Sequence, residues 1–409
     1  MDRKTFLRYS IVFSAVYFFS TNGLAALPNL SINFLLKEKI GLTPSQMAYF
    51  QAVTILAWVV KPFWGFLSDS FPIFGYRRKS YLILTSVLAG LAWFSLGLIH
   101  HYSVGILLGL ITVSYMAYAF QDVVTDGLMV EVGKPFNLTG KFQSIQWGAV
   151  YAAMILTALC GGYLSDLTRK GSVSHQSIFM GVSIFALLTA FISAFYIRES
   201  KHTPREAMEE ADLKDVLKNK SLWLLAFFMF FWKFSPSVNA PFFYYAVDTL
   251  KFSGSFLGIL QSTAAAAAFA GAILYGKYLA EYSIRKLLVF AVFASITMTL
   301  FDFIYFVPYF VAHSQTLKTI AFISRIPFGI VETVIHLSIL NLAAKVSPRF
   351  AGGTVFALLM SFSNLGLMGS DVLGGFLFPI LGFQPLILVS AFFTLLALPL
   401  IRFLSIHET

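Results

Sequence analysis

Twelve apolar segments of membrane-spanning length run through this chain of 409 residues and leave few folds open to it. A helix needs about 20 apolar residues to cross the hydrocarbon core of a bilayer. The segments are predicted at 6–28, 44–66, 80–99, 103–129, 140–163, 174–198, 221–247, 253–279, 284–309, 316–341, 350–374 and 382–405. Because the backbone must satisfy its own hydrogen bonds in lipid, the pattern predicts an all-α protein of twelve transmembrane helices.

The composition agrees with a protein embedded in a lipid bilayer. Hydrophobic residues make up 58% of the chain and charged residues 12%, about half the charged share of a soluble protein. The net charge of +10 does not predict a nucleic-acid partner, because most cations lie in short loops beside apolar segments. A single cysteine, Cys160, excludes an internal disulfide, and its apolar surroundings predict an inert core residue. No metal-binding or cofactor motif is found, so no cofactor is expected.

The distribution of Lys and Arg predicts the orientation in the membrane. With both termini cytoplasmic, the inner loops and tails hold 20 of the 29 cations and the outer loops hold 6. The first apolar run is long enough to span and lacks a convincing cleavage site, so it predicts a helix rather than a signal peptide. Without a transit peptide before it, a multi-pass protein of the bacterial cytoplasmic (inner) membrane is expected.

Recurring residues predict two six-helix halves of related structure. Pro28 and Gly161 in the first half recur in order, at nearly constant separation, as Pro241 and Gly374 in the second. The predicted domains are residues 1–198, a polar cytoplasmic linker at 199–220, and residues 221–409. Duplicated halves of this kind place the substrate site between them near the bilayer midplane, and transport follows when one half rocks on the other.

Three charged residues in the first half are expected to lie within the membrane. Asp122 and Asp126 are four residues apart, so they share one face of a helix. Lys61 lies at a similar depth in the second segment, which predicts an ion pair between Lys61 and Asp122. A carboxyl group whose lysine partner moves away can change protonation, so these residues are candidates for proton coupling.

A second interpretation of the acidic residues is a latch at the cytoplasmic side. The loop between the second and third segments carries Asp69 and the pair Arg77 and Arg78, while Glu131 lies at the cytoplasmic end of the fourth segment. These groups, with Asp126 or Glu131 as the acidic partner, would hold one conformation without binding substrate. The loop is therefore predicted to act as a gate.

Two cations near mid-depth in the second half predict an anionic substrate. They are Lys233 and Arg325, and an arginine can bind a carboxylate through two parallel hydrogen bonds. The following Pro327 removes a backbone donor, which can bend the helix and open a cavity. The alternative is a simple ion pair between Arg325 and Glu332, which lies two turns away on the same face and is also a proton-coupling candidate. His336, one turn further, is expected to be a packing residue.

Several uncharged residues are predicted to line a cavity, although amides within membrane spans often only join helices. The substrate-binding candidates of this kind are Asn22, Gln51, Gln146, Gln261, Asn364 and Trp147, the last through ring stacking.

Two stretches resemble a known family. Gly65, Asp69, Gly75 and the cations at 77–79 resemble the loop signature of the major facilitator superfamily. The longer stretches KPFWGFLSDSFPIFGYRRKSYLIL (61–84) and QDVVTDGLMVE (121–131) are similar to the folate-biopterin transporter family. The resemblance implies proton-coupled import of a folate or pterin. A monomer is expected. It marks as family-motif positions Lys61, Asp69, Arg77, Arg78, Asp122 and Asp126.

Other functions fit the residues less well. A carrier of the same fold for another organic anion, such as a nucleotide, sugar phosphate or amino-acid derivative, remains the principal alternative. A channel would be expected to show rings of polar residues or a filter-like loop, and neither is found. An enzyme is not expected, because the acidic pair of the fourth segment lacks a nucleophile or metal partner.

Overall fold

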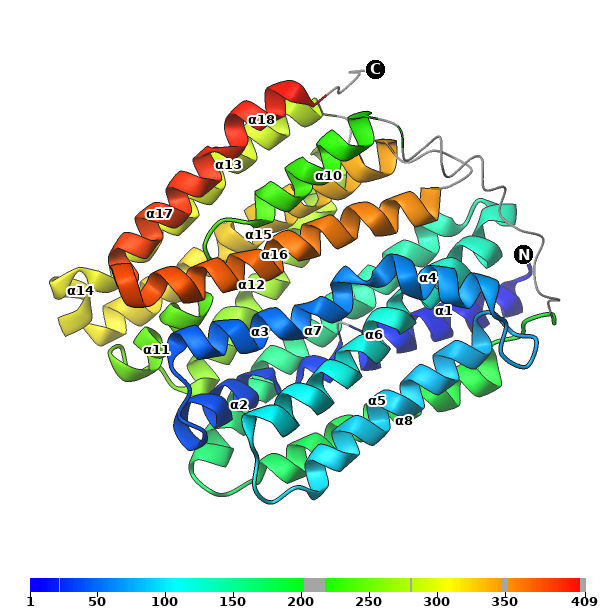
Figure 1. The fold of residues 1–409 in the computed structure, drawn as a ribbon, viewed down its shortest axis with the longest axis horizontal. Coiled ribbons are helices and arrows are strands. Elements are labelled where there is room, and N and C mark those ends of the chain that lie inside the picture. Colours follow the sequence, from blue (N-terminus) through cyan, green and yellow to red (C-terminus); the bar gives the residue numbers. More distant parts are fainter. Residues whose placement is uncertain (22, 202–217, 219, 280–281, 347–351, 405–409) are drawn as a thin grey trace. The chain divides into compact units, whose positions relative to one another are not determined.

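The structure is a computed structural model that describes residues 1–21, 23–201, 218, 220–279, 282–346 and 352–404. All secondary-structure elements within these ranges are helices (Figure 1). The described residues form no strand, and a single isolated β-bridge joins Ile73 and Tyr76. Eleven of the described helical segments are long and apolar enough to cross a membrane, and Leu222–Lys233 is a shorter apolar helix. The all-α membrane fold is therefore confirmed. Most of the predicted linker at 199–220 lies outside the described residues.

The chain forms two compact units, and the first consists of residues 1–40 and 60–208. Within it, α5 and α8 pack along their lengths, and α1 packs on both α7 and α8. Its elements are α1 (Arg3–Phe19), η1 (Leu24–Ala26), α2 (Asn29–Phe34), η2 (Leu35–Lys39), α4 (Lys61–Ser70), α5 (Lys79–Leu98), α6 (Val104–Gly133), η3 (Lys134–Phe136), α7 (Thr139–Arg169) and α8 (His175–Tyr196).

The second unit consists of residues 41–59 and 209–409. Helix α12 packs along α15 here, and α16 packs on both α3 and α10. Its elements are α3 (Pro44–Val59), α10 (Lys220–Lys233), α11 (Asn239–Asp248), α12 (Gly254–Leu274), η4 (Tyr275–Leu279), α13 (Ile284–Phe301), η5 (Asp302–Phe306), α14 (Pro308–Ala312), α15 (Ser314–Val346), α16 (Gly352–Leu381), α17 (Phe383–Leu395) and α18 (Ala397–Phe403).

The second apolar segment is broken near its middle and is shared by the two units. Helix α3 ends at Val59, and α4 begins at Lys61 after Val60, whose φ and ψ are −87° and 14°. Pro62 lies in the first turn of α4, where its missing backbone N–H costs no helical hydrogen bond. The break sets the first residue of α4, Lys61, at a helix start rather than in the middle of a straight span.

The first and seventh segments are also broken, and each break is met by hydroxyl groups of the last segment in its own unit. Ser20, just after α1, lies 2.8 Å from the Thr189 hydroxyl of α8. Ser235, between α10 and α11, lies 2.9 Å from the Ser390 hydroxyl of α17. A break in a membrane helix leaves backbone groups without helical partners. Here the Thr21 hydroxyl donates to the Val16 carbonyl oxygen, and the Ser370 hydroxyl donates to the Ser235 carbonyl oxygen.

Matching glycines pack against the two breaks. A Cβ added to Gly161 on α7 would lie 2.7 Å from the Leu27 carbonyl oxygen, and one added to Gly374 on α16 would lie 2.2 Å from the Ser237 carbonyl oxygen. Both positions therefore require glycine for the backbones to approach so closely. The recurrence of Gly161 as Gly374 in the sequence thus has the same structural basis in each unit.

Aromatic packing fixes α4 against α6 in the first unit. The rings of Trp64 and Phe120 stack with centroids 5.0 Å apart. The ring of Tyr81 in α5 also packs on Phe120, again with centroids 5.0 Å apart. Trp64 is three residues after Lys61, and Phe120 is two residues before Asp122. The stacked rings therefore bring the charged side chains of α4 and α6 to the same region.

Candidate functional site

The predicted pair between Lys61 and Asp122 forms in the structure. Lys61 Nζ lies 2.5 Å from Asp122 Oδ2, and the two side chains are 15% and 10% exposed. A charge-assisted hydrogen bond of this length, largely withdrawn from solvent, is a strong contact between α4 and α6. The pair neutralises two charges that would each be costly alone within a membrane span.

Tyr17 joins the second acidic residue to this pair, a contact that the sequence analysis missed. Its hydroxyl lies 2.8 Å from Asp122 Oδ1 and 2.9 Å from Asp126 Oδ1. Tyr17 lies in α1 and is separated from Asp122 by 105 positions in the sequence. With 18 tyrosines in the sequence, nothing local distinguishes Tyr17, so only the packing of α1 on α6 reveals it.

Two of the gating candidates, Asp69 and Glu131, meet at one buried arginine, Arg78. Its Nη2 lies 2.7 Å from both Asp69 Oδ1 and Glu131 Oε1, and its Nη1 lies 3.1 Å from the Ser68 hydroxyl. The arginine side chain is 8% exposed, while those of Asp69 and Glu131 are 47% and 34% exposed. Arg78 thus holds the end of α4 and the C-terminal part of α6 together.

The charge of Arg78 is secured by its acidic neighbours. Burial works to lower its pKa, but Glu131 and then Asp69 outweigh that effect, so the pKa of Arg78 lies above its usual value. Asp126 is not part of this cluster, because its hydroxyl partner is Tyr17. Of the two acidic partners considered for the latch, the structure therefore places Glu131 there.

A third carboxylate, Glu199, caps the helix that follows the loop. Its oxygens accept hydrogen bonds from the backbone N–H groups of Arg77, Arg78 and Lys79 at 2.8, 3.1 and 2.8 Å. Lys79 is the first residue of α5 and Arg78 is its N-cap, and N–H groups at this end of a helix have no partner within it. A negative charge at a helix N-terminus is also favourable. The sequence analysis placed Glu199 in the linker and missed this role.

Gly127 on α6 makes room for the Arg78 guanidinium, which gives a testable prediction. A Cβ at this position would lie 2.7 Å from Arg78 Cζ and 2.9 Å from its Nη1. Gly127→Ala is therefore expected to displace the guanidinium and to lower the free energy of unfolding by about 1–3 kcal/mol, in spite of alanine's better helix propensity. Gly109→Ala in the same helix is the matched control, since nothing lies within 4 Å of its added Cβ.

Thermal unfolding of the purified variants would measure this difference. Gly109→Ala should keep or slightly raise the melting temperature, because it gains helix propensity without a clash. Equal melting temperatures for the two variants would contradict the proposed contact of Arg78 with the α6 backbone.

Arg325 in the second unit is bound to Tyr305. Its Nη2 donates a hydrogen bond of 3.2 Å to the Tyr305 hydroxyl, and its Nε is buried without a hydrogen-bond partner among the described residues. Asp302 interacts electrostatically with Arg325, but the two form no ion pair in the described part of the chain. Arg325 and Glu332 form no ion pair in the structure, because the Arg325 side chain is directed to Tyr305 of η5.

Lys233 ends α10 and interacts electrostatically with His336 of α15, which is partly buried. Glu332, one turn before His336, is exposed. The sequence analysis missed a further carboxyl group, Asp371, which is 5% exposed on α16 and interacts with the Ser237 hydroxyl at the break between α10 and α11. In the second unit Lys233, Arg325 and Asp302 are thus partly buried, and Asp371 is buried.

Two of the predicted amides, Asn364 and Gln146, have different surroundings in the structure. Asn364 of α16 donates a hydrogen bond of 3.1 Å to the Trp58 carbonyl oxygen, close to the break after α3. Gln146 of α7 is 3% exposed and faces Asp126. Asn364 thus joins two helices of the second unit, as amides in membrane spans often do.

The remaining uncharged candidates are spread over the two units. Trp147 packs on Tyr151 with ring centroids 5.9 Å apart, Gln51 is half-buried and Gln261 is exposed. Asn22 lies outside the described residues. Among the described residues, Gln51 and Gln261 of the second unit form no hydrogen bond with each other.

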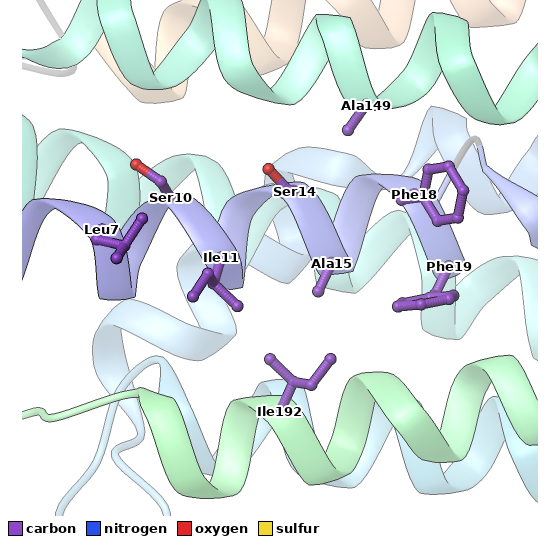
Figure 2. A pocket seen from close by; sticks show the side chains of 9 residues that line it. All are labelled: Leu7, Ser10, Ile11, Ser14, Ala15, Phe18, Phe19, Ala149 and Ile192. Carbon is purple, nitrogen blue, oxygen red and sulfur yellow. The ribbon is translucent and has the colours of Figure 1, made fainter.

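A groove runs along α1 in the first unit, but its lining does not suit an anion. Figure 2 shows side chains of α1 facing Ala149 of α7 on one side and Ile192 of α8 on the other. Apart from Ser10 and Ser14 the lining is apolar, and it contains none of the predicted site residues. The full lining is Leu7, Ser10, Ile11, Ser14, Ala15, Phe18, Phe19, Ala149 and Ile192.

Among the described residues no group of three or more His, Cys, Asp or Glu side chains is placed to hold a metal ion. Cys160 is exposed, so the prediction of a core residue was wrong. An apolar residue on the outside of a membrane helix faces lipid, and the sequence pattern alone does not distinguish that position from the core.

The sequence was compared with models of known protein families. A family model described as the BT1 family matches residues 22–408. The chain belongs to the BT1 family. This BT1 protein is similar to the folate-biopterin transporter of Synechocystis, with 29% identity over 95% of the chain and 80% of that protein. It is also similar to folate transporter 1 of Plasmodium falciparum, with 27% identity over 87% of the chain and 70% of that protein.

Solved structures show the fold of the BT1 protein. A mutant of the nucleoside transporter NupG aligns with a TM-score of 0.74 and 11% identity, over 98% of this chain and all of its own. A D-xylose-proton symporter aligns with a TM-score of 0.70 and 13% identity, over 98% of both chains. The architecture is that of the major facilitator transporters. The protein is thus a multi-pass membrane transporter, and the prediction that it is not an enzyme is confirmed.

Proposed function

We propose that this BT1 protein imports folate- or pterin-like anionic heterocycles by proton-coupled alternating access. The observation that carries the proposal is the similarity, over most of the chain, to relatives named for folate and biopterin transport. The charges of the described residues support it. The second unit offers partly buried cations for an anionic group, and the first unit offers a carboxyl network within the membrane.

Arg325 is proposed to bind the anionic part of the substrate. Its guanidinium has one neutral partner, Tyr305, and a buried Nε with no partner among the described residues, so it has donors left for a carboxylate. Lys233 is proposed as a second cation of the substrate site, and Glu332 as a proton-coupling or charge-pair residue. The proposed polar or stacking contacts are Gln51, Gln146, Gln261, Asn364 and Trp147. Asp69, Arg77, Arg78 and Glu131 are proposed to gate the cytoplasmic side.

Replacing Arg325 with glutamine should weaken substrate affinity about 10- to 100-fold, since a charge-assisted hydrogen bond contributes about 1.5–3 kcal/mol. The measurement is the concentration of folate or pterin that half-saturates uptake. Lys318→Ala removes one positive charge from the same helix, at a site where the ammonium lies over the Phe256 ring, and should leave that concentration unchanged. An unchanged affinity in Arg325→Gln would remove Arg325 from the substrate site.

The direct test of the function is uptake into proteoliposomes. Purified protein should accumulate labelled folate or a labelled pterin, faster when the outside is more acidic than the inside. Empty liposomes and an excess of unlabelled substrate give the background. Lack of uptake across a panel of folates and pterins would overturn the substrate assignment, while uptake that ignores the pH gradient would overturn only the proton coupling.

The second candidate is a carrier of the same fold for another organic anion. The same two cations favour it, because they recognise an anionic group and not a ring system. Thermal-shift measurements against nucleotides, sugar phosphates and amino-acid derivatives would separate the two candidates, since a ligand that binds only the folded state raises its apparent stability.

The membrane location is proposed from the charge distribution. The excess of Lys and Arg in alternate loops supports cytoplasmic termini, with a bacterial inner membrane as the proposed site. A monomer is proposed as the working unit, as is usual when one chain supplies both six-helix halves. Cysteine labelling from either side of the membrane, at positions introduced into the loops, would test the orientation.

A further inference from the structure

The Tyr17 hydroxyl lies between two carboxyl groups. It is 2.8 Å from Asp122 Oδ1 and 2.9 Å from Asp126 Oδ1, on successive turns of α6. Tyr17 itself is 7% exposed, so water has little access to its side chain. Both distances are those of O–H···O hydrogen bonds.

A count of protons shows what this arrangement requires. A phenol hydroxyl carries one hydrogen and can donate one hydrogen bond, while its oxygen can accept others. Two ionised carboxylates accept hydrogen bonds but cannot donate them. If both aspartates were ionised, one of the two short contacts would join two oxygens without a hydrogen between them. A proton on one of the carboxyl groups supplies the missing hydrogen, so that this group donates to the tyrosine oxygen while the tyrosine donates to the other carboxylate.

The neighbouring groups identify the protonated residue. Asp122 receives the ammonium of Lys61 on its second oxygen at 2.5 Å, which favours its ionised form. Asp126 has no cation within ion-pair distance among the described residues. The groups that face it are Tyr17 of α1, Lys61 of α4 at longer range, Asp122 of its own helix and the neutral Gln146 of α7. The hydrogen-bonded chain thus runs from Asp126 through Tyr17 to Asp122 and Lys61.

We propose that Asp126 is the carboxyl group that binds the coupling proton, and that Tyr17 links its protonation to the Lys61–Asp122 pair. The protonated Asp126 donates to Tyr17, and Tyr17 donates to Asp122. When the proton leaves Asp126 for water, the hydroxyl can satisfy only one carboxylate. The other carboxylate then lacks a hydrogen-bond donor. Lys61 now interacts with two negative charges, Asp122 and Asp126, instead of one. Loss of the proton therefore weakens the contact of α1 with α6 and loosens the hold of α4.

The protonation can be tested without any substrate. Infrared difference spectra between acidic and alkaline pH should contain a carboxylic-acid C=O band that Asp126→Asn removes. Tyr17→Phe keeps the ring and removes the hydroxyl, so the band should persist at a shifted frequency. Asp371→Asn, a buried carboxyl of the second unit, is the control and should leave this band in place. A band unaffected by Asp126→Asn, or removed by Asp371→Asn alone, would overturn the assignment.

The coupling role rests on the proposed function and has its own readout. Asp126→Asn should abolish the stimulation of folate uptake by a pH gradient but keep exchange of labelled for unlabelled folate. If the infrared band belongs to Asp126 and the gradient still drives uptake in this variant, the carboxyl is structural and the coupling role is wrong. If the wild type carries no folate or pterin, the proposed substrate fails, while the infrared spectra still decide the protonation.

Discussion

Arg78→Ala is expected to lower the free energy of unfolding by about 3 kcal/mol and to reduce transport strongly. The substitution leaves Asp69 and Glu131 facing each other without a cation and removes the partner of the Ser68 hydroxyl. Removing one partner of a buried charge cluster costs about 3–5 kcal/mol. The lower end applies here, because the two carboxylates are partly exposed and solvent screens them.

Two further variants make the measurement specific. Arg78→Lys keeps the charge but cannot bind two carboxylates and a hydroxyl with one planar fork, so it should recover only part of the stability. Arg285→Ala removes an exposed cation near the start of α13 and should change the free energy by no more than about 0.5 kcal/mol. Denaturation of the three variants in one detergent would give the comparison. A loss in Arg285→Ala as large as that in Arg78→Ala would refute a specific role for the cluster.

Hydropathy predicted the membrane spans well because it depends only on local composition, but it did not predict where they break. The interruption after Val59 and the one between α10 and α11 occur inside apolar sequence. Pro62 and Pro236 mark both places, yet a proline within a membrane helix often only kinks it. Whether the chain breaks there depends on hydroxyl and amide partners from distant helices, such as Ser390 and Asn364.

The candidate site shows the same division between local and distant information. Lys61, Asp122 and Arg78 could be predicted because a charge within or beside an apolar segment needs a partner. Tyr17 and Glu199 could not, since their roles depend on contacts more than 100 residues away in the chain. Glu199 sits among other charged residues and resembles a solvated linker position. Its capping of α5 appears only once the chain has folded.

The Lys61–Asp122 pair offers the second large effect, through a double-mutant cycle. Lys61→Met and Asp122→Asn are each expected to destabilise the protein by about 3–5 kcal/mol, because each leaves one largely buried charge without its partner. The double variant removes both charges and should recover most of that loss, since the remaining neutral side chains carry no uncompensated charge.

Stability and transport should separate in the double variant. Its melting temperature should return toward that of the wild type, while pH-driven uptake should stay impaired, because Tyr17 would no longer join Asp126 to an ion pair. Additive losses in the double variant would show that the two residues do not interact. If the double variant instead recovers both stability and pH-driven uptake, the pair only holds α4 against α6. In the expected case, the ion pair at the start of α4 both fixes this helix and connects it to the carboxyl that takes up the proton.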